Sequence, residues 1–300
     1  MLMKPSMDFV FKRLFGAEES KDSLISLLNA IIKSDNPIKD IELKSPDLEK
    51  QHIGDKFCRL DIKAKTDKGE IINVEIQVRD EYNMVQRTLY YWSKIYSDQL
   101  GASENYKNLA RTVCINILNF KLLDNDRYHN TYRLKEITTN EELTDIEEIH
   151  FIELPKSKEI KSEEVNNIDS LLKWIEFIKE PESETVRILE LTDESIRKAK
   201  TQLYKLSLDK KTIEQYRIRE KAMYDEISAL ENSREKGLQE GVKIGRKEGK
   251  EEGLKEGEVR GKLKANRKIA KNLLSKGLEL KEIAKILELD ENLVEEIIKD

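Results

Sequence analysis

Apolar and polar residues alternate along residues 60–78, LDIKAKTDKGEIINVEIQV, with the period of two that half-buried strands show. Between the two alternating runs lies Thr66-Asp67-Lys68-Gly69, which is typical of a turn because Gly69 suits a left-handed backbone. The pattern therefore predicts a β-hairpin with one apolar and one polar face. The polar face carries Asp61, Lys63, Lys65, Glu75 and Gln77.

The same kind of pattern predicts helices and strands on both sides of the hairpin. Strands interleaved with helices indicate an α/β fold whose sheet is covered on its faces. The expected elements are a helical stretch over 5–33, a strand over 38–43, a helix over 84–100 ended by Gly101, a continuous apolar strand over 113–120, and strands over 128–137 and 149–154. Residues 46–55 are expected to form a loop.

The second half of the chain changes in character. Residues 160–232 are acidic and read as helices, and after them glycine recurs at every fourth position from Gly237 to Gly261. The predicted organisation has four parts. These are a core over 1–158, an acidic helical region over 159–232, a glycine-repeat charged helix or linker over 233–264, and a small helical, helix-turn-helix-like tail over 265–300.

The glycine repeat allows two interpretations. Seven glycines cost a helix about 1 kcal/mol each relative to alanine, so an isolated helix of this sequence would be marginal. In the first interpretation the repeat is a flexible charged linker. In the second, the small residues pack against a partner such as another copy of the chain, giving a homo-oligomer. A partner that followed the stripe would wind right-handed, because a four-residue repeat exceeds the helical period.

Composition narrows the class of protein. Charged residues make up 38% and the net charge is −5, so the surface as a whole does not favour DNA. Residues 1–140 are nearly balanced, with 22 basic and 21 acidic residues, so any DNA contact there must be local. The last predicted helix carries Glu291, Glu295 and Glu296, and this acidic character favours a contact module over DNA reading in the tail. No long apolar run or signal peptide is present, so we expect a cytoplasmic protein without a membrane span.

Candidate chemistry centres on the hairpin. Asp61 and Glu75 converge on its polar face, and Mg²⁺ is usually held by one or two carboxylates together with phosphate oxygens. The alternative is an ordinary solvated sheet edge, which also carries such residues. The cysteines Cys58 and Cys114 and the histidines His52, His129 and His150 have no metal-binding spacing.

Three segments together resemble one known family. They are the KPSMDFVFKRLFG run over 4–16, the Asp61…Glu75-Ile76-Gln77 hairpin, and the QRTLYYW run over 86–92. In this order they resemble the Rpn family of recombination-promoting, transposase-related nucleases within the PD-(D/E)XK superfamily, over about residues 3–155. The resemblance implies a restriction-endonuclease-like mixed sheet flanked by helices and a metal-dependent DNA endonuclease. Gln77 departs from the pattern, since the superfamily has lysine there.

The resemblance also suggests roles for individual side chains. Asp61, Glu75 and Asp8 would hold Mg²⁺, for which Mn²⁺ could substitute. Asp8 and Lys12 also form a simple i,i+4 pair, so the alternative reading of both is structural. With Gln77 able only to orient water, Lys63 is the nearest replacement cation and Lys12 the second. The residues expected to bind DNA are Arg87, which can clamp a phosphate, Lys12, and the Gln86–Tyr90 pair, which resembles a QxxxY motif.

Two functions follow from this reading. The first is hydrolysis of DNA phosphodiester bonds, linked to recombination or mobile elements. The second is a nuclease-fold scaffold with weak or no catalysis, which acts through oligomerisation or partner binding by the glycine-repeat helix. Gln77 and the acidic overall charge motivate the second reading.

Overall fold

The computed structural model describes residues 2–47, 60–101, 103–158, 160, 165 and 167–299. Cys58, His52 and most of the loop expected over 46–55 lie outside the described residues. The chain divides into two compact units, Met1–Glu220 and Lys221–Asp300. Each unit is described by itself.

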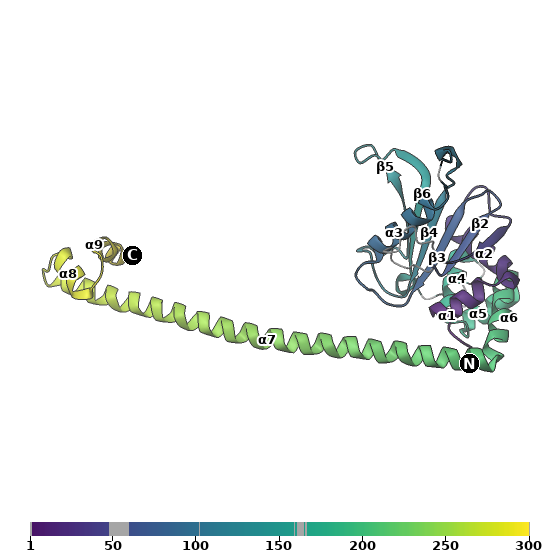
Figure 1. Ribbon diagram of the computed structural model, residues 1–300. Coiled ribbons are helices and arrows are strands. Elements are labelled where there is room, and N and C mark those ends of the chain that lie inside the picture. Colours follow the sequence, from purple (N-terminus) through teal and green to yellow (C-terminus); the bar gives the residue numbers. More distant parts are fainter. Residues whose placement is uncertain are drawn as a thin grey trace. The chain divides into compact units, whose positions relative to one another are not determined.

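The first unit is built on a six-stranded mixed sheet of order β1-β2-β3-β4-β6-β5 (Figure 1). The first three strands are antiparallel, β3, β4 and β6 run parallel, and β5 returns antiparallel to β6. The strands are β1 (Ile41–Lys44), β2 (Ile62–Thr66), β3 (Ile71–Gln77), β4 (Thr112–Leu118), β5 (His129–Lys135) and β6 (Glu142–Glu153).

The predicted hairpin is confirmed as β2 and β3. Gly69 closes its turn at a φ of 85°, a left-handed value that glycine adopts without the cost a side chain brings. The prediction that both strands are half-buried is wrong for β3, where six of the seven residues are buried. The cause is topology: β3 lies inside the sheet, between β2 and β4, with helices on both faces.

Helices cover the two faces unequally (Figure 1). The first face packs against α1 (Asp8–Phe15), α2 (Lys21–Ile32), α4 (Ser170–Lys179), α5 (Glu184–Thr192) and α6 (Glu194–Leu208), and the second against α3 (Met84–Ser97). Short 3₁₀ turns occur at Glu18–Ser20, Tyr106–Asn108 and Leu154–Lys156. Residues 170–208 therefore help to build the core of the sheet.

The helical stretch expected over 5–33 is two helices. A β-carbon at Gly16 would lie 2.5 Å from the Lys12 carbonyl oxygen, so the glycine allows the close approach that ends α1. Ala17 is extended, and α2 begins at Lys21. The break turns the chain so that α1 and α2 both bury apolar side chains in the same core.

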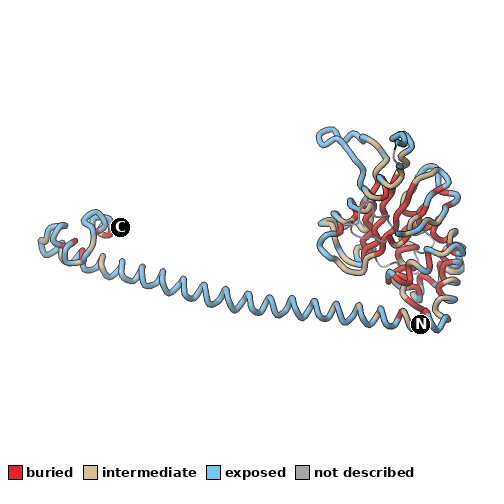
Figure 2. Tube along the Cα trace, in the orientation of Figure 1, coloured by how far each residue is buried: buried red, intermediate tan, exposed pale blue. Residues whose placement is uncertain are grey.

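The long helix α7 spans Lys210–Ser275 without interruption and is almost wholly exposed beyond residue 221 (Figure 2). The glycine repeat is therefore helical, yet beyond the adjacent residues and the local helix backbone no atom of the described chain lies within 4 Å of a β-carbon built at any of its seven glycines. Contacts within the described chain thus do not explain the glycines. A partner remains a prediction.

The predicted tail helices are α8 (Leu280–Leu287) and α9 (Glu291–Lys299). They form a small core with the end of α7, centred on Ala270, Ile283 and Val294. Throughout the described ranges, no helix combines the length and the apolar character that crossing a membrane requires.

Candidate active site

The hairpin places Asp61 beside Glu75. Ile62 lies opposite Val74 in the antiparallel register, so Asp61 and Glu75 occupy the next position on each chain. Their groups interlock: the Asp61 backbone N–H donates to Glu75 Oε1 at 3.1 Å, and the Ile76 N–H donates to Asp61 Oδ2 at 2.8 Å. Each carboxylate is thus oriented by the backbone of the other strand.

Both carboxyl groups are largely buried, and their hydrogen bonds and ion pairs do not fully offset the loss of hydration. Burial, together with the charge of Asp61, raises the pKa of Glu75 to about 8. Burial also raises the pKa of Asp61, against the opposing effect of Lys12. Glu75 Oε2 is buried and has no hydrogen-bond partner. A buried acceptor without a partner is costly, so this oxygen is a natural place for an added cation.

Helix α1 supplies a cation to the site. Lys12 Nζ lies 2.7 Å from Asp61 Oδ1 and 3.9 Å from Asp8 Oδ2. The i,i+4 pair of the sequence exists, but the shorter contact of Lys12 is to the hairpin. The Asp8 carboxylate is half-exposed and accepts a hydrogen bond from the Phe9 N–H, so it joins the site through Lys12.

Helix α3 supplies a second cation above β3. Arg87 Nη1 donates to Gln77 Oε1 at 3.4 Å, and Nη2 lies 3.8 Å from Glu75 Oε2. Arg87 Nε donates to the Tyr91 hydroxyl at 3.2 Å, and the guanidinium also lies 3.8 Å from Glu81. Gln77 therefore holds an arginine by its amide oxygen at the position where the motif has a lysine.

Within the described residues, the other predicted side chains form no hydrogen bond or ion pair with the two carboxylates. Lys63 lines a pocket of about 220 Å³ with Lys12 and Asp61, but it forms no ion pair with another described residue. Gln86 is exposed, and Tyr90 is 40% exposed on the outer side of α3. The structure therefore brings Arg87, and not the Gln86–Tyr90 pair, to the carboxylates.

The sequence model of the family described as PD-(D/E)XK nuclease family transposase matches residues 5–233. The chain belongs to this family. The match covers the whole sheet of this PD-(D/E)XK protein, helices α4–α6 and the start of α7. No curated protein and no solved structure matches the chain.

Family membership sets expectations that the site can be tested against. PD-(D/E)XK nucleases act on DNA and generally use divalent metals. Within the described ranges, no group of three or more His, Cys, Asp or Glu side chains is arranged to hold a metal ion. Two carboxylates fit such an ion, since Glu75 Oε2 lacks a hydrogen bond and oxygen ligands suit Mg²⁺.

A buried polar pair next to the PD-(D/E)XK carboxylates was missed by the sequence reasoning. Asn116 lies directly beside Glu75 in the parallel β3–β4 register and is fully buried. Its Oδ1 accepts a hydrogen bond from Thr88 Oγ1 of α3 at 3.0 Å. The available signal was an asparagine inside an otherwise apolar strand, because a buried amide requires hydrogen-bond partners from neighbouring elements.

The second missed feature is a buried charge cluster on the same sheet. Glu148 is 1% exposed and contacts Arg111 at 2.8 Å, Arg133 at 2.5 Å and His150 Nε2 at 2.8 Å. Burial opposes its ionisation, but His150 and the two arginines outweigh this and lower the pKa of Glu148 to about 2. His150 Nδ1 in turn lies 2.9 Å from His129 Nε2.

Proposed function

We propose that this PD-(D/E)XK protein is a Mg²⁺-dependent endonuclease that hydrolyses phosphodiester bonds in DNA, with Asp61 and Glu75 as the metal ligands. The observation that carries the proposal is the interlocked carboxylate pair, in which one buried oxygen of Glu75 has no hydrogen bond. Family membership supplies the reaction class.

The chain's own residues prepare the site before substrate binds. The Ile76 N–H fixes one oxygen of Asp61, and the Asp61 N–H fixes one oxygen of Glu75, so the second oxygen of each carboxylate has a set direction. A bound Mg²⁺ would lower the pKa of its water and stabilise charge on the phosphate. Arg87, from α3, can contact a phosphate oxygen at the edge of the same site.

Lys12 is the strongest candidate for the cation that Gln77 does not provide. Its ammonium group already lies 2.7 Å from Asp61, whereas Lys63 has no such contact. In this proposal Lys12 stabilises the developing charge on the scissile phosphate. Lys12 comes from α1, so the function of the missing strand lysine is transferred to a helix that packs beside it.

The test is cleavage of supercoiled plasmid by the full chain with Mg²⁺, Mn²⁺ or EDTA. We expect metal-dependent nicking that is lost in Asp61→Asn and in Glu75→Gln. Glu18→Gln is the matched control, because it removes a carboxylate that is 65% exposed and whose ion pair among the described residues is with Lys21. Folding of each variant is checked by its circular dichroism and melting temperature.

The outcomes separate the proposal from the scaffold reading. Cleavage of DNA in EDTA by the folded wild-type chain would contradict the proposal. The absence of cleavage with either Mg²⁺ or Mn²⁺ would contradict it as well. Equal activity in Glu75→Gln and in the control would contradict the assignment of Glu75. A folded, inactive wild-type chain would shift the function to partner binding, with the glycine repeat of α7 as the next element to test.

A further inference from the structure

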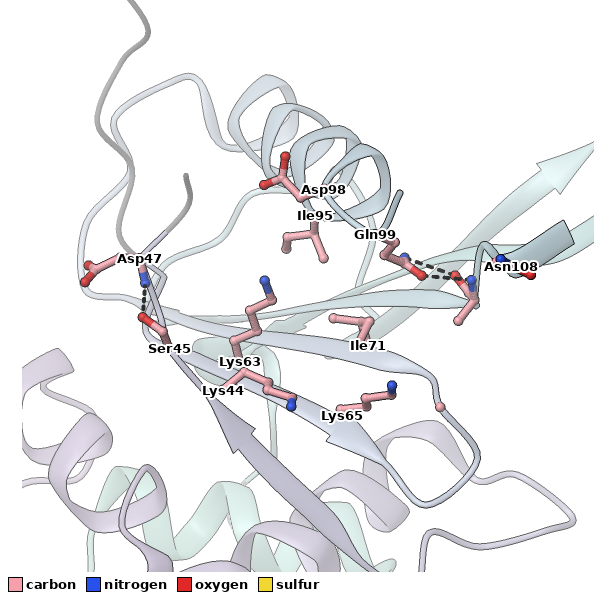
Figure 3. A pocket seen from close by; sticks show the side chains of 12 residues that line it. Lys44, Ser45, Asp47, Lys63, Lys65, Ile71, Ile95, Asp98, Gln99 and Asn108 are labelled. Carbon is pink, nitrogen blue, oxygen red and sulfur yellow. Dashed lines mark hydrogen bonds between the residues drawn. The ribbon is translucent and has the colours of Figure 1, made fainter. Parts of the chain in front are cut away.

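Three lysines line one pocket on the α3 face of the sheet. The pocket holds about 480 Å³, and in Figure 3 the Lys63 side chain extends from β2 toward α3 with Lys44 and Lys65 beside it. Lys63 and Lys65 are alternate residues of one strand, so they project from the same face about 7 Å apart. The pocket is therefore lined by a row of three ammonium groups rather than by a single charged side chain.

The arrangement of these lysines has a cost. Lys44 of β1 is the direct antiparallel partner of Lys63 of β2. Like charges directly opposite each other on one face destabilise a sheet. Glu42 relieves part of the repulsion by pairing with Lys44, but Lys63 and Lys65 form no ion pair with any other described residue. An anionic ligand would remove this cost.

The lysine pocket adjoins the candidate active site. Lys44 and Lys63 line both this pocket and the smaller pocket of about 220 Å³ that contains Asp61 and Lys12. Asp61 directly precedes β2, and Lys63 and Lys65 follow it at alternate positions. Lys63 and Lys65 therefore lead away from the carboxylates along β2, with Lys44 beside them on β1.

The balance of charged residues that line the pocket restricts which kind of anion can bind there. Two aspartates, Asp47 after β1 and Asp98 at the end of α3, also line the pocket. Its net charge is therefore modest, so it does not suit a compact, highly charged anion. A chain of single negative charges spaced along the strand matches the row of lysines better. The backbone of a nucleic acid is such a ligand.

We propose that Lys44, Lys63 and Lys65 bind the phosphate groups of the DNA strand that leads into the candidate active site. This inference rests on the proposed nuclease function and assigns Lys63 to substrate binding. It also agrees with the nearly balanced charge of residues 1–140, which requires a local DNA contact, because these lysines lie on two short strands.

The test is DNA affinity of the full chain in EDTA, measured by fluorescence anisotropy of a labelled duplex over a range of salt concentrations. The test variant is Lys63→Ala with Lys65→Ala. The matched control is Lys39→Ala with Lys135→Ala, which removes the same charge from exposed residues that line neither pocket. A third variant, Lys63→Arg with Lys65→Arg, keeps the charge.

We expect the test variant to bind roughly tenfold more weakly at ~0.1 M salt, with a salt slope reduced by about 1.8 for two lost phosphate contacts. The control and the arginine variant should retain the wild-type slope. The melting temperature should not fall, since the substitution removes repulsion between Lys44 and Lys63. An unchanged slope in the test variant, or an equal loss in the control, would overturn the inference.

Cleavage in Mg²⁺, measured in parallel, keeps the two proposals separate. If the wild-type chain does not cut DNA but the test variant still loses affinity, the binding site stands and the nuclease proposal fails. If the chain cuts DNA, the test variant should show a raised KM with kcat retained. A fall in kcat with KM unchanged would place Lys63 in catalysis and overturn its assignment to binding.

Discussion

Two glutamates are buried on the same sheet, and their surroundings are opposite. Glu148 contacts Arg111, Arg133 and His150, and its pKa is lowered to about 2. Glu75 lies beside another carboxylate, has an arginine only at 3.8 Å, and its pKa is raised to about 8. Both glutamates are 1% exposed, so burial alone does not distinguish them.

We interpret the difference as one between a structural charge, Glu148, and the proposed metal ligand Glu75. A buried carboxylate with a full set of partners holds its neighbours together and has little capacity for another ligand. A buried carboxylate oxygen that accepts no hydrogen bond is unfavourable, and a bound cation can relieve this cost. We therefore expect that removing the Glu75 charge lowers activity but not stability, and that removing the Glu148 charge lowers stability but not activity.

The largest expected effect is on catalysis by Glu75→Gln. We expect cleavage to fall on the order of 10³-fold, or about 4 kcal/mol in activation free energy. The free energy of unfolding in EDTA should stay within about 1 kcal/mol of wild type, because the variant removes a poorly paired buried charge. Plasmid cleavage and urea unfolding measure the two effects, and a large loss of stability would contradict the comparison.

The next effect is on stability by Glu148→Gln. One pKa unit corresponds to about 1.4 kcal/mol, so the lowering of the Glu148 pKa from 4.5 to about 2 predicts a loss on the order of 3 kcal/mol at pH 7. Urea unfolding measures this loss, and cleavage per folded molecule should be retained. Glu142→Gln is a suitable control, since its carboxylate is 39% exposed and also contacts Arg133.

A smaller effect is expected from Mg²⁺ on the folded protein. A ligand that binds only the native state at ten times its Kd stabilises it by about 1.4 kcal/mol. Mg²⁺ should therefore raise the melting temperature of wild type and of Glu148→Gln, but not of Glu75→Gln. An equal rise in all three proteins would mean that the ion binds elsewhere.

The site shows how far the sequence alone could lead. Period-two alternation located the hairpin and placed Asp61 and Glu75 on one face, because strand geometry is local. Burial of that face could not be predicted from alternation, since it depends on β4 and α3, which come later in the chain. The contact of Lys12 with Asp61 could not be predicted from the sequence either, because it depends on how α1 packs against the sheet.

The charge cluster of Glu148 was missed for a related reason. Its partners Arg111 and Arg133 belong to two other segments of the chain, and only the pairing of β4, β5 and β6 brings them together. The glycine repeat shows the opposite relation between sequence and structure. Its four-residue period is evident in the sequence, but no contact within the described chain explains it.

The smallest effect is the pH dependence of stability that Glu148 contributes. Its folded-state pKa of about 2 lies below the ordinary 4.5, so its contribution is fully present above pH 4.5 and is lost as the pH falls toward 2. Between pH 6 and pH 4 the stability difference between wild type and Glu148→Gln should therefore shrink by about 1 kcal/mol. Carboxyls common to both proteins cancel in this difference, so paired urea unfolding curves at the two pH values measure the single group. A difference that stays constant would mean that the arginines and His150 do not hold Glu148 ionised, and the contrast with Glu75 would then rest on geometry alone.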